Sequence, residues 1–418
     1  MRQNTFIVAL IFFIFFVISF LSNILGPIIP DILNSFELGI GLAGFLPFSF
    51  FISYGLTSIP AGVLVEKYKE KKVLLIAFFL AFLGALFFAL VPIFPVALLS
   101  LFIIGTGMAM LQVVINPLLR VAGGGVNFAF NSVMAQLFFG GASFLSPMLY
   151  SYFVKHVHAG EPSNFIIENI NKIVPSNLAW ISLYWVFAII ALLMIVIIKS
   201  IKFPKVELAE DERIETGNAL RELLKDKKVI LFFIGIFCYV GTEQGIANWT
   251  SKFLQEYHGV DPATLGASII SYFWGLLTIG CFLGLMLLKL FDSRKVLISF
   301  TIGAIVALLL GLFGPLNWAL VCFPLTGFFA SVMWSIVVSL ALNSLAKHHG
   351  TFSGILCTGI AGGAFVPLII GGLGELVGLR LAMLFLLVTL GYILSIGFWA
   401  KPLVTNSTIK NWKEIFHV

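Results

Sequence analysis

The chain has 418 residues, of which 60% are hydrophobic, 15% aromatic and only 11% charged. Soluble domains are about 25% charged, so this chain has too few charges to cover the water-facing surface that its length would require. The composition excludes a soluble multidomain enzyme, a disordered protein and a disulfide scaffold. The net charge of +6 is carried by short loops, which is typical of membrane topology and not of a nucleic-acid-binding face.

Twelve long apolar runs follow one another along the chain. About 20 apolar residues cross the hydrocarbon core of a bilayer as a helix, so each run is long enough for one span. The runs lack the ten-residue alternation of a membrane β-barrel, and the first run is too long for the apolar core of a signal peptide. The expected spans are residues 6–33, 39–65, 73–93, 95–119, 127–154, 178–199, 229–255, 262–290, 296–314, 316–345, 351–374 and 379–400.

The lysines and arginines indicate how these spans are oriented. With both termini placed in the cytoplasm, 21 of the 25 lysines and arginines fall in cytoplasmic segments and 4 in outer segments. An excess of basic residues marks the cytoplasmic side of a membrane protein. The sequence therefore predicts an all-α membrane protein with twelve transmembrane helices and cytoplasmic N- and C-termini.

A long cytoplasmic segment divides the chain into two parts with six spans each. The loops after the second and eighth spans, residues 62–74 and 284–297, share a Gly, a Lys and a Lys-Val-Leu sequence at similar places. Parallel repeats with a binding site between them are a transporter architecture. We expect two six-helix halves at residues 1–199 and 229–400, a cytoplasmic linker at 200–228 and a cytoplasmic tail at 401–418.

Glu243 is the one acidic residue that we expect deep inside a span. It lies about fourteen residues into the seventh run, which places it ~20 Å from the start of that helix. Polar groups in the hydrocarbon layer are costly and face a cavity or another helix. Two interpretations stay open: a carboxylic acid that hydrogen-bonds to a neighbouring helix, or a group on the central path that carries a proton, binds sodium or holds a substrate hydroxyl. The six histidines lie in loops, so no histidine relay is expected.

Amide side chains occur in the spans of both halves. Gln244 and Asn248 follow Glu243 within five residues, and Gln112 and Asn116 are four residues apart, which places them on one helix face. Amides donate to and accept from hydroxyl groups, and a tryptophan ring stacks on the C–H face of a sugar. The alternative is that these amides join helices to one another. The candidate substrate-binding residues are Asn23, Gln112, Asn116, Gln136, Gln244, Asn248, Trp249 and Trp334.

The remaining sequence offers no catalytic centre. The four cysteines lie in separate apolar runs without a Cys-x-x-Cys spacing, so we expect buried free thiols. The spans contain no nucleophile–base pair, and no glycine-rich phosphate loop follows a strand. We therefore expect no catalytic residues, no enzymatic activity and no cofactor. Transport would use an ion gradient or run downhill, and a sodium site beside Glu243 is the one metal site that we expect.

The loop after the second span carries Gly62, then Glu66-Lys67 and Lys69-Glu70. This is a degenerate form of the signature of the major facilitator superfamily, which has Asp-Arg and Gly-Arg at the last two places, and the chain resembles that family over most of its length. Within the family it is similar to the fucose/glucose/galactose–cation symporter group, which includes sodium-dependent glucose transporters. The stretches that carry the similarity are residues 59–68, 105–117, 239–249 and 331–371.

The resemblance implies roles for particular residues. In the fucose–proton symporter a first-span acid and a fourth-span acid serve substrate and proton, and this sequence has Asn23 and Gln112 at those places. A fourth-span Gln and a seventh-span Glu are similar to the glucose/galactose members, which makes Glu243 the cation-coupling candidate. Cys281 stands where many relatives have Arg. The candidate residues of a cytoplasmic gate are Gly62, Glu66, Lys67 and Arg120.

These features predict a secondary active transporter that moves a hexose or related sugar by alternating access, coupled to a sodium or proton gradient. One alternative is transport or efflux of amphipathic drugs or lipids, which the 44 phenylalanines would suit. Another is a non-transporting sensor built on a transporter body. The expected partners are the sugar and the lipid bilayer, without nucleic acid. We expect a monomer in a bacterial inner membrane or a plasma membrane.

Overall fold

The computed structural model describes residues 5–123, 128–159, 165–203, 218–345 and 349–403. Every secondary-structure element in these ranges is helical. Within them, twelve stretches are long and apolar enough to cross a membrane, and each overlaps one of the predicted spans. The predicted all-α membrane fold is confirmed, while the cytoplasmic placement of the termini stays a prediction. Residues 204–217 of the predicted linker and 404–418 of the predicted tail lie outside the described residues.

The first six spans combine continuous helices with interrupted ones. Continuous helices cross in the third and fourth spans, whereas the first span contains two helices in succession. The elements are α1 (Thr5–Ser22), α2 (Leu25–Ser35), α3 (Ile40–Ala43), α4 (Phe45–Tyr68), α5 (Glu70–Leu90), α6 (Phe94–Gly123), α7 (Phe128–His156), α8 (Phe165–Ile173), η2 (Ser176–Ile181) and α9 (Ser182–Ser200).

The last six spans follow the short helix α10 (Asn218–Leu223) and show the same mixture. The tenth, eleventh and twelfth spans are each built from more than one helical element. The elements are α11 (Lys227–His258), η4 (Pro262–Gly266), α12 (Ala267–Leu290), α13 (Ser293–Phe313), α14 (Leu316–Ala330), α15 (Met333–Leu342), α16 (His349–Thr358), η5 (Gly359–Ala361), α17 (Gly362–Val377), α18 (Leu379–Ala382) and α19 (Phe385–Trp399).

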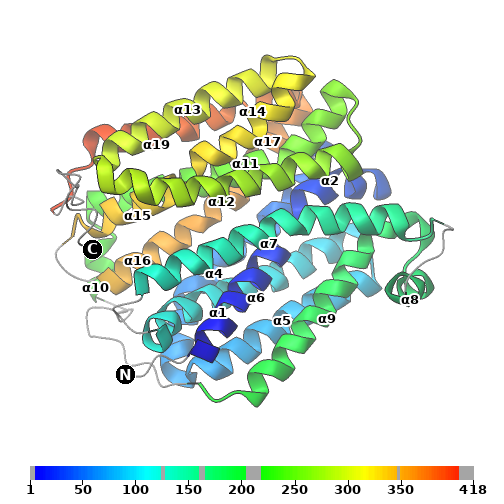
Figure 1. Cartoon of the computed structure of the whole chain (residues 1–418), viewed down its shortest axis with the longest axis horizontal. Helices are drawn as coiled ribbons and strands as arrows, with labels where there is room; N and C mark the ends of the chain where they lie inside the picture. The colour runs from blue at the N-terminus through cyan, green and yellow to red at the C-terminus, as the bar shows by residue number, and fades with distance from the viewer. Residues whose placement is uncertain (1–4, 124–127, 160–164, 204–217, 346–348, 404–418) are drawn as a thin grey trace.

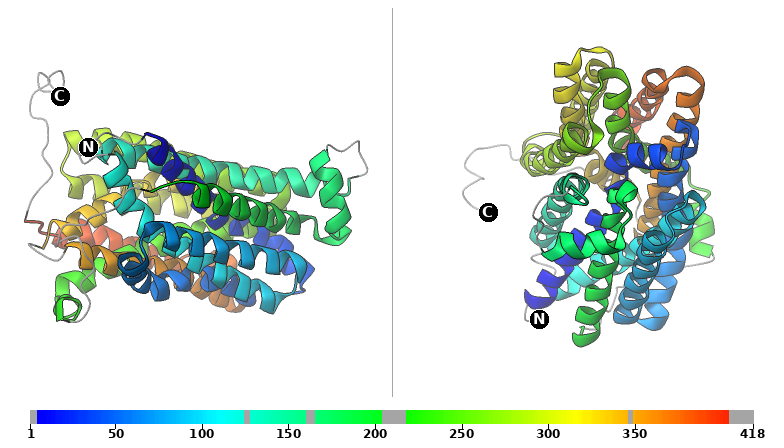
Figure 2. Two further views of the ribbon diagram at one scale, coloured as in Figure 1. Left: turned by 90° about the horizontal axis from the view of Figure 1, so that it is seen from below. Right: turned by 90° about the vertical axis from the view of Figure 1, so that its right-hand side faces the viewer.

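The two groups of spans lie side by side. Most helices from α1 to α9 occupy the lower part of Figure 1, and most of those from α11 to α19 occupy the upper part. Among the pairs that join the groups, α7 packs along α12, α4 along α17, and α2 against α11. The short α8 lies at one end of the bundle and α10 at the other, as Figure 2 also shows. We name these the α8 end and the α10 end.

The first span is broken part-way along its length. α1 ends at Ser22 and α2 begins at Leu25, which leaves Asn23 and Ile24 between the two helices. Pro27 has no N–H to donate to the carbonyl of Asn23 four residues earlier, and its ring crowds that carbonyl. Irregular backbone at membrane depth is tolerated where it is buried in protein or lines a polar path. Asn23 is 6% exposed, so the break is buried in the protein, and it places a polar side chain at this depth.

The tenth span contains a second break, between α14 and α15. The Sγ atom of Cys281 on α12 donates to the carbonyl oxygen of Ser331 in this break at 3.3 Å. The thiol thus satisfies a backbone acceptor that no lipid could satisfy. All four cysteines are free thiols, as predicted. Cys238 and Cys322 are buried, whereas Cys281 and Cys357 are only half-buried, so the prediction of burial is confirmed for two of the four.

Two glycines let α6 approach its neighbours closely. A Cβ atom at Gly105 would collide with the backbone oxygen of Phe50 on α4, and one at Gly107 would lie 2.5 Å from the backbone oxygen of Ala77 on α5. Close packing over small residues holds helices together in lipid, where no hydrophobic driving force acts between them. The positions of α4 and α5 beside α6 therefore depend on these glycines.

Gly105→Val should destabilise the protein by about 1–3 kcal/mol, because the backbone of Phe50 cannot move aside as a flexible side chain would. Gly391→Val on α19 is the matched control, since a Cβ atom there meets nothing within 4 Å. Thermal unfolding of the two purified variants in detergent should give a lower midpoint for Gly105→Val. Equal midpoints would contradict this account of the packing.

Candidate functional site

Glu243 forms hydrogen bonds to two neighbours on its own helix, α11. The hydroxyl of Tyr239 donates to Oε2 of Glu243 at 2.6 Å, and Nε2 of Gln244 donates to Oε1 at 3.2 Å. Glu243 is half-buried and Tyr239 is 4% exposed. Residues four apart on a helix lie one above the other. Tyr239 was not among the predicted residues, although its position four residues before Glu243 was a signal in the sequence that could have identified it.

Gln244 connects Glu243 to the other group of spans. Its Nε2 atom also donates to Oδ1 of Asn23 at 3.4 Å. Nδ2 of Asn248 donates to the backbone oxygen of Gln244 at 2.8 Å and to its Oε1 at 3.3 Å. The amide of Gln244 is therefore held by α11 on one side and by the α1–α2 break on the other.

On the far side, Asn23 continues into a cluster of hydroxyl groups. Its Nδ2 atom donates to Oγ of Ser143 on α7 at 2.9 Å and to Oγ of Ser19 at 3.3 Å. The two serine hydroxyls lie 2.5 Å apart. Neither serine was among the predicted residues, because a hydroxyl in a membrane helix commonly bonds only to its own backbone and nothing in the sequence pattern distinguishes these two.

These residues form one connected set that we name the polar seam. It runs from the last six spans to the first six through hydrogen bonds between side chains. In a membrane interior a polar group without a partner is expensive, so the seam holds its members in place by satisfying them mutually. The members are Tyr239, Glu243, Gln244 and Asn248 on α11, Asn23 at the α1–α2 break, Ser19 on α1 and Ser143 on α7.

The two predicted tryptophans have different surroundings. Trp334, half-buried at the start of α15, has its ring centroid 6.0 Å from that of Tyr239 and so lies beside the seam. Trp249 is fully buried, and its Nε1 atom donates to the backbone oxygen of Pro367 on α17 at 3.0 Å. Trp249 thus packs between α11 and α17 in this structure, and stacking on a sugar stays a prediction for both residues.

The remaining residues predicted for substrate binding and for gating are not members of the polar seam. Gln112 is half-buried on α6 and Gln136 is exposed on α7, while Gly62 is buried in α4. Lys67 is exposed at the end of α4, with its ammonium 5.2 Å from the centre of the Tyr68 ring. The side chains of Glu66, Asn116 and Arg120 lie outside the described residues. The structure leaves the substrate and gating roles of these residues as predictions.

The described residues contain no group of three or more His, Cys, Asp or Glu side chains that would hold a metal ion. A cation at Glu243 would therefore rely on one carboxylate together with neutral oxygens. The seam offers the hydroxyl of Tyr239 and the amide oxygens of Gln244 and Asn23 near that carboxylate. Oxygen atoms of these kinds suit a proton or a sodium ion, and they equally suit sugar hydroxyls.

The two groups of spans meet closely between the seam and the α8 end. The backbone N–H of Gly41 donates to Oε2 of Glu375 at 2.5 Å. A Cβ atom at Gly26 would collide with the backbone oxygen of Ala247, and one at Gly44 would lie 3.0 Å from the Cα of Leu368. The two groups of spans are therefore in direct contact on the side of the α8 end.

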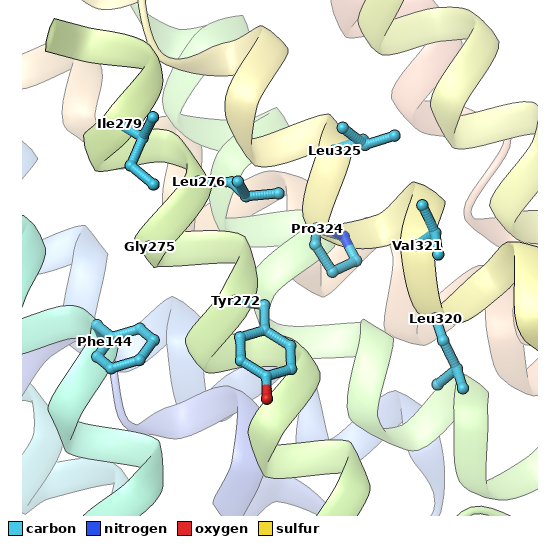
Figure 3. Close-up of a pocket in the computed structure, with 9 residues that line it drawn as sticks. All are labelled: Phe144, Tyr272, Gly275, Leu276, Ile279, Leu320, Val321, Pro324 and Leu325. Carbon is cyan, nitrogen blue, oxygen red and sulfur yellow. The ribbon is translucent and has the colours of Figure 1, made fainter.

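A separate apolar hollow lies on the flank of the bundle. Figure 3 shows it between α12 and α14, with Phe144 contributed by α7. Its cavity volume is about 340 Å³, and none of the residues of the seam lines it. The lining residues are Phe144, Tyr272, Gly275, Leu276, Ile279, Leu320, Val321, Pro324 and Leu325. The polar and the apolar candidate sites are therefore distinct.

The chain belongs to the Major Facilitator Superfamily, whose sequence pattern matches residues 11–355. This confirms the resemblance noted in the sequence, and it agrees with the twelve spans. The chain is therefore a multi-pass membrane protein of a transporter family.

Within this family, the chain is similar in sequence to proteins that are named as sugar transporters. The chain is 28% identical over 393 residues to a glucose/galactose transporter of Brucella abortus biovar 1 (strain 9-941), which covers 92% of this chain and 91% of that protein. It is 25% identical over 381 residues to an L-fucose-proton symporter of Escherichia coli (strain K12), covering 88% and 87% of the two chains. A crystal structure of the E. coli fucose:proton symporter matches with a TM-score of 0.68 at 22% identity, over 96% of this chain and all of that one. The structural match shows the shared fold.

Proposed function

We propose that the chain is a secondary active transporter that moves a hexose or related sugar across a bacterial inner membrane or a plasma membrane by alternating access. The observation that carries this proposal is the polar seam, in which one carboxylate and several amides join the two groups of spans. The names of its relatives, a glucose/galactose transporter and an L-fucose-proton symporter, support a sugar as the substrate. In this proposal the protein works as a monomer, and it moves the sugar without altering it chemically.

The seam supplies the groups that a sugar requires. Each sugar hydroxyl both donates and accepts a hydrogen bond, and the amides of Asn23, Gln244 and Asn248 do the same. Trp334 offers an aromatic face beside them. Gln112, Asn116 and Gln136 complete the proposed substrate set from α6 and α7. The hydroxyls of the sugar form hydrogen bonds in place of those within the seam. Few polar groups are therefore left without a partner when the sugar enters the site.

Glu243 is the proposed coupling residue, for a proton or for sodium. Gln244 donates one amide hydrogen to Glu243 and another to Asn23. A proton or sodium ion on Glu243 weakens the carboxylate as an acceptor, which releases the amide of Gln244 toward Asn23 or toward the sugar. Ion binding in one half is thereby communicated to the other half. Coupling of this kind is a difference in affinity between two states of the protein.

Alternating access follows from the placement of the contacts. Residues 1–199 and 229–400 are the two proposed moving halves, joined by the linker at 200–228, with the tail at 401–418 and the α10 end in the cytoplasm. The contacts of Gly26, Gly41 and Gly44 join the two groups at the α8 end. In the proposed cycle these contacts separate in one state, and the halves separate in the other state at the α10 end, where Gly62, Glu66, Lys67 and Arg120 form the proposed gate.

A second candidate function is transport of amphipathic drugs or lipids. The apolar hollow of Figure 3, which opens on the flank of α12 and α14, is the observation that favours it. An apolar tail fits that hollow, whereas a sugar does not. A flux assay with both kinds of substrate separates the two functions.

Glu243→Gln should abolish accumulation of radiolabelled glucose in proteoliposomes under an imposed sodium or proton gradient, because an amide neither binds a proton nor carries the charge that sodium requires. Exchange of labelled for unlabelled glucose without a gradient should persist. Glu256→Gln is the matched control, since Glu256 is an exposed residue of the same helix. The ion whose gradient drives the wild type is the coupling ion.

Loss of exchange together with accumulation would assign Glu243 to substrate binding or to packing instead. Absence of flux in the wild type for glucose, galactose and fucose under either gradient would overturn the sugar assignment. Gradient-driven movement of an amphipathic dye by the same vesicles would then establish the second function.

Asn23→Ala and Gln244→Ala should have non-additive effects on the apparent affinity for glucose in the exchange assay. Side chains in direct contact show coupling energies of about 0.5–3 kcal/mol. The pair Asn131→Ala and Gln244→Ala is the matched control, with Asn131 a buried amide elsewhere on α7. Additive effects of Asn23 and Gln244 would show that the connection across the seam does not contribute to transport.

A further inference from the structure

The turn between α4 and α5 forms a basic hollow on the surface of the protein. Its cavity volume is about 490 Å³, and it is lined by Lys67, Tyr68, Lys69, Lys71, Lys72 and Leu75. The second span ends at Val65 and the third begins at Glu70. The hollow therefore lies where the chain leaves and re-enters the membrane, at the level of the lipid headgroups.

We propose that this hollow binds an anionic phospholipid, with the phosphate on the lysines and an acyl chain passing Leu75. Basic pockets at the ends of transmembrane helices recognise acidic lipid headgroups through charge and hydrogen bonding. The site is distinct from the polar seam and independent of the transported substrate.

The lysines of the hollow carry charge that the described residues do not neutralise. Within the described side chains the one ion pair joins Arg294 to Asp292 at 3.3 Å. Lys67, Lys69 and Lys72 are exposed. The buried Glu70 is not among the residues that line the hollow. An anion entering the hollow therefore meets lysine ammonium groups that no carboxylate of the described side chains occupies.

One ammonium group is fixed in position. Nζ of Lys71 donates to the backbone oxygens of Lys199 at 2.8 Å and Ile201 at 2.6 Å, at the end of α9. These bonds use two of the three hydrogens of the ammonium group and anchor the wall of the hollow against α9. The remaining hydrogen and the positive charge stay available to a ligand.

The backbone of the turn is strained at one of these lysines. Lys69 has φ 69° and ψ 162° between the two helices. This conformation is strained for any residue with a Cβ atom and costs about 1–3 kcal/mol. A glycine would adopt it without strain. The lysine thus sits where backbone stability alone favours glycine, and its ammonium group lines the hollow.

The hollow is amphipathic, which favours a lipid over a soluble phosphate. Leu75 lies five residues into α5, about 8 Å along the helix from Glu70, and so faces the start of the hydrocarbon layer. Tyr68 is 40% exposed, and its ring provides an apolar body with a polar tip, as is common at membrane interfaces. A free anion would contact the lysines alone.

Native mass spectrometry of the full-length protein in detergent tests the site with phosphatidylglycerol as the probe. Lys67→Gln/Lys72→Gln should weaken binding at least about tenfold, since each lysine near the membrane surface contributes separately to attraction of an anionic lipid. These two substitutions do not change Lys69 in the strained turn, and they do not change Lys71, which bonds to the end of α9. Lys225→Gln/Lys228→Gln is the matched control, because both lysines are exposed near the start of α11 but line neither hollow.

The expected result is that wild type and control retain phosphatidylglycerol equally, prefer it to phosphatidylcholine, and keep it in the presence of millimolar inorganic phosphate. Unchanged binding by Lys67→Gln/Lys72→Gln with an unfolding midpoint equal to that of wild type would overturn the proposal. Equal retention of phosphatidylcholine, or displacement of the lipid by inorganic phosphate, would overturn it as well. If the double variant unfolds, the preference for phosphatidylglycerol and its resistance to phosphate in the wild type decide the matter.

Discussion

The arrangement of this protein depends on the cost of a polar side chain without a partner inside a membrane. Glu243 and Gln244 lie part-way along α11, and Asn23 lies at a break in the first span. Because lipid offers no hydrogen bonds, these groups must satisfy one another across the boundary between the two groups of spans. The requirement places the polar seam at the junction where a transporter must open and close.

The same requirement explains how the seam can respond to a ligand. Its hydrogen bonds are made between side chains, and a sugar hydroxyl or a cation can replace them without leaving a group unsatisfied. The surrounding close contacts are different in kind, since Gly26 and Gly44 allow backbones of opposite groups to touch. A seam of exchangeable bonds beside a rigid contact of small residues is suited to two alternative packings, and bistable interfaces of this kind underlie large conformational changes.

The sequence was sufficient for the fold but only for part of the site. Runs of apolar residues predicted all twelve spans, because a membrane span is fixed by local composition and length. Glu243, Gln244, Asn248 and Asn23 were predicted from their polarity within those runs. Ser19 and Ser143 were not, since their role depends on how α1 packs against α7, and the buried position of Trp249 depends on α17. The positive φ of Lys69 also required the structure.

A disulfide that links the two halves across their contact at the α8 end tests directly whether transport requires the halves to separate there. A Cβ atom at Gly41 would lie 3.8 Å from that of Glu375, which is about the separation of Cβ atoms in a disulfide. Gly41→Cys/Glu375→Cys, in a protein whose four native cysteines are replaced by serine, should exchange glucose when reduced, stop when oxidised and recover with reductant. Glucose exchange by either single-cysteine variant should be the same with and without the oxidant. Undiminished exchange by the fully linked protein would contradict the account, because the halves would then not need to separate there.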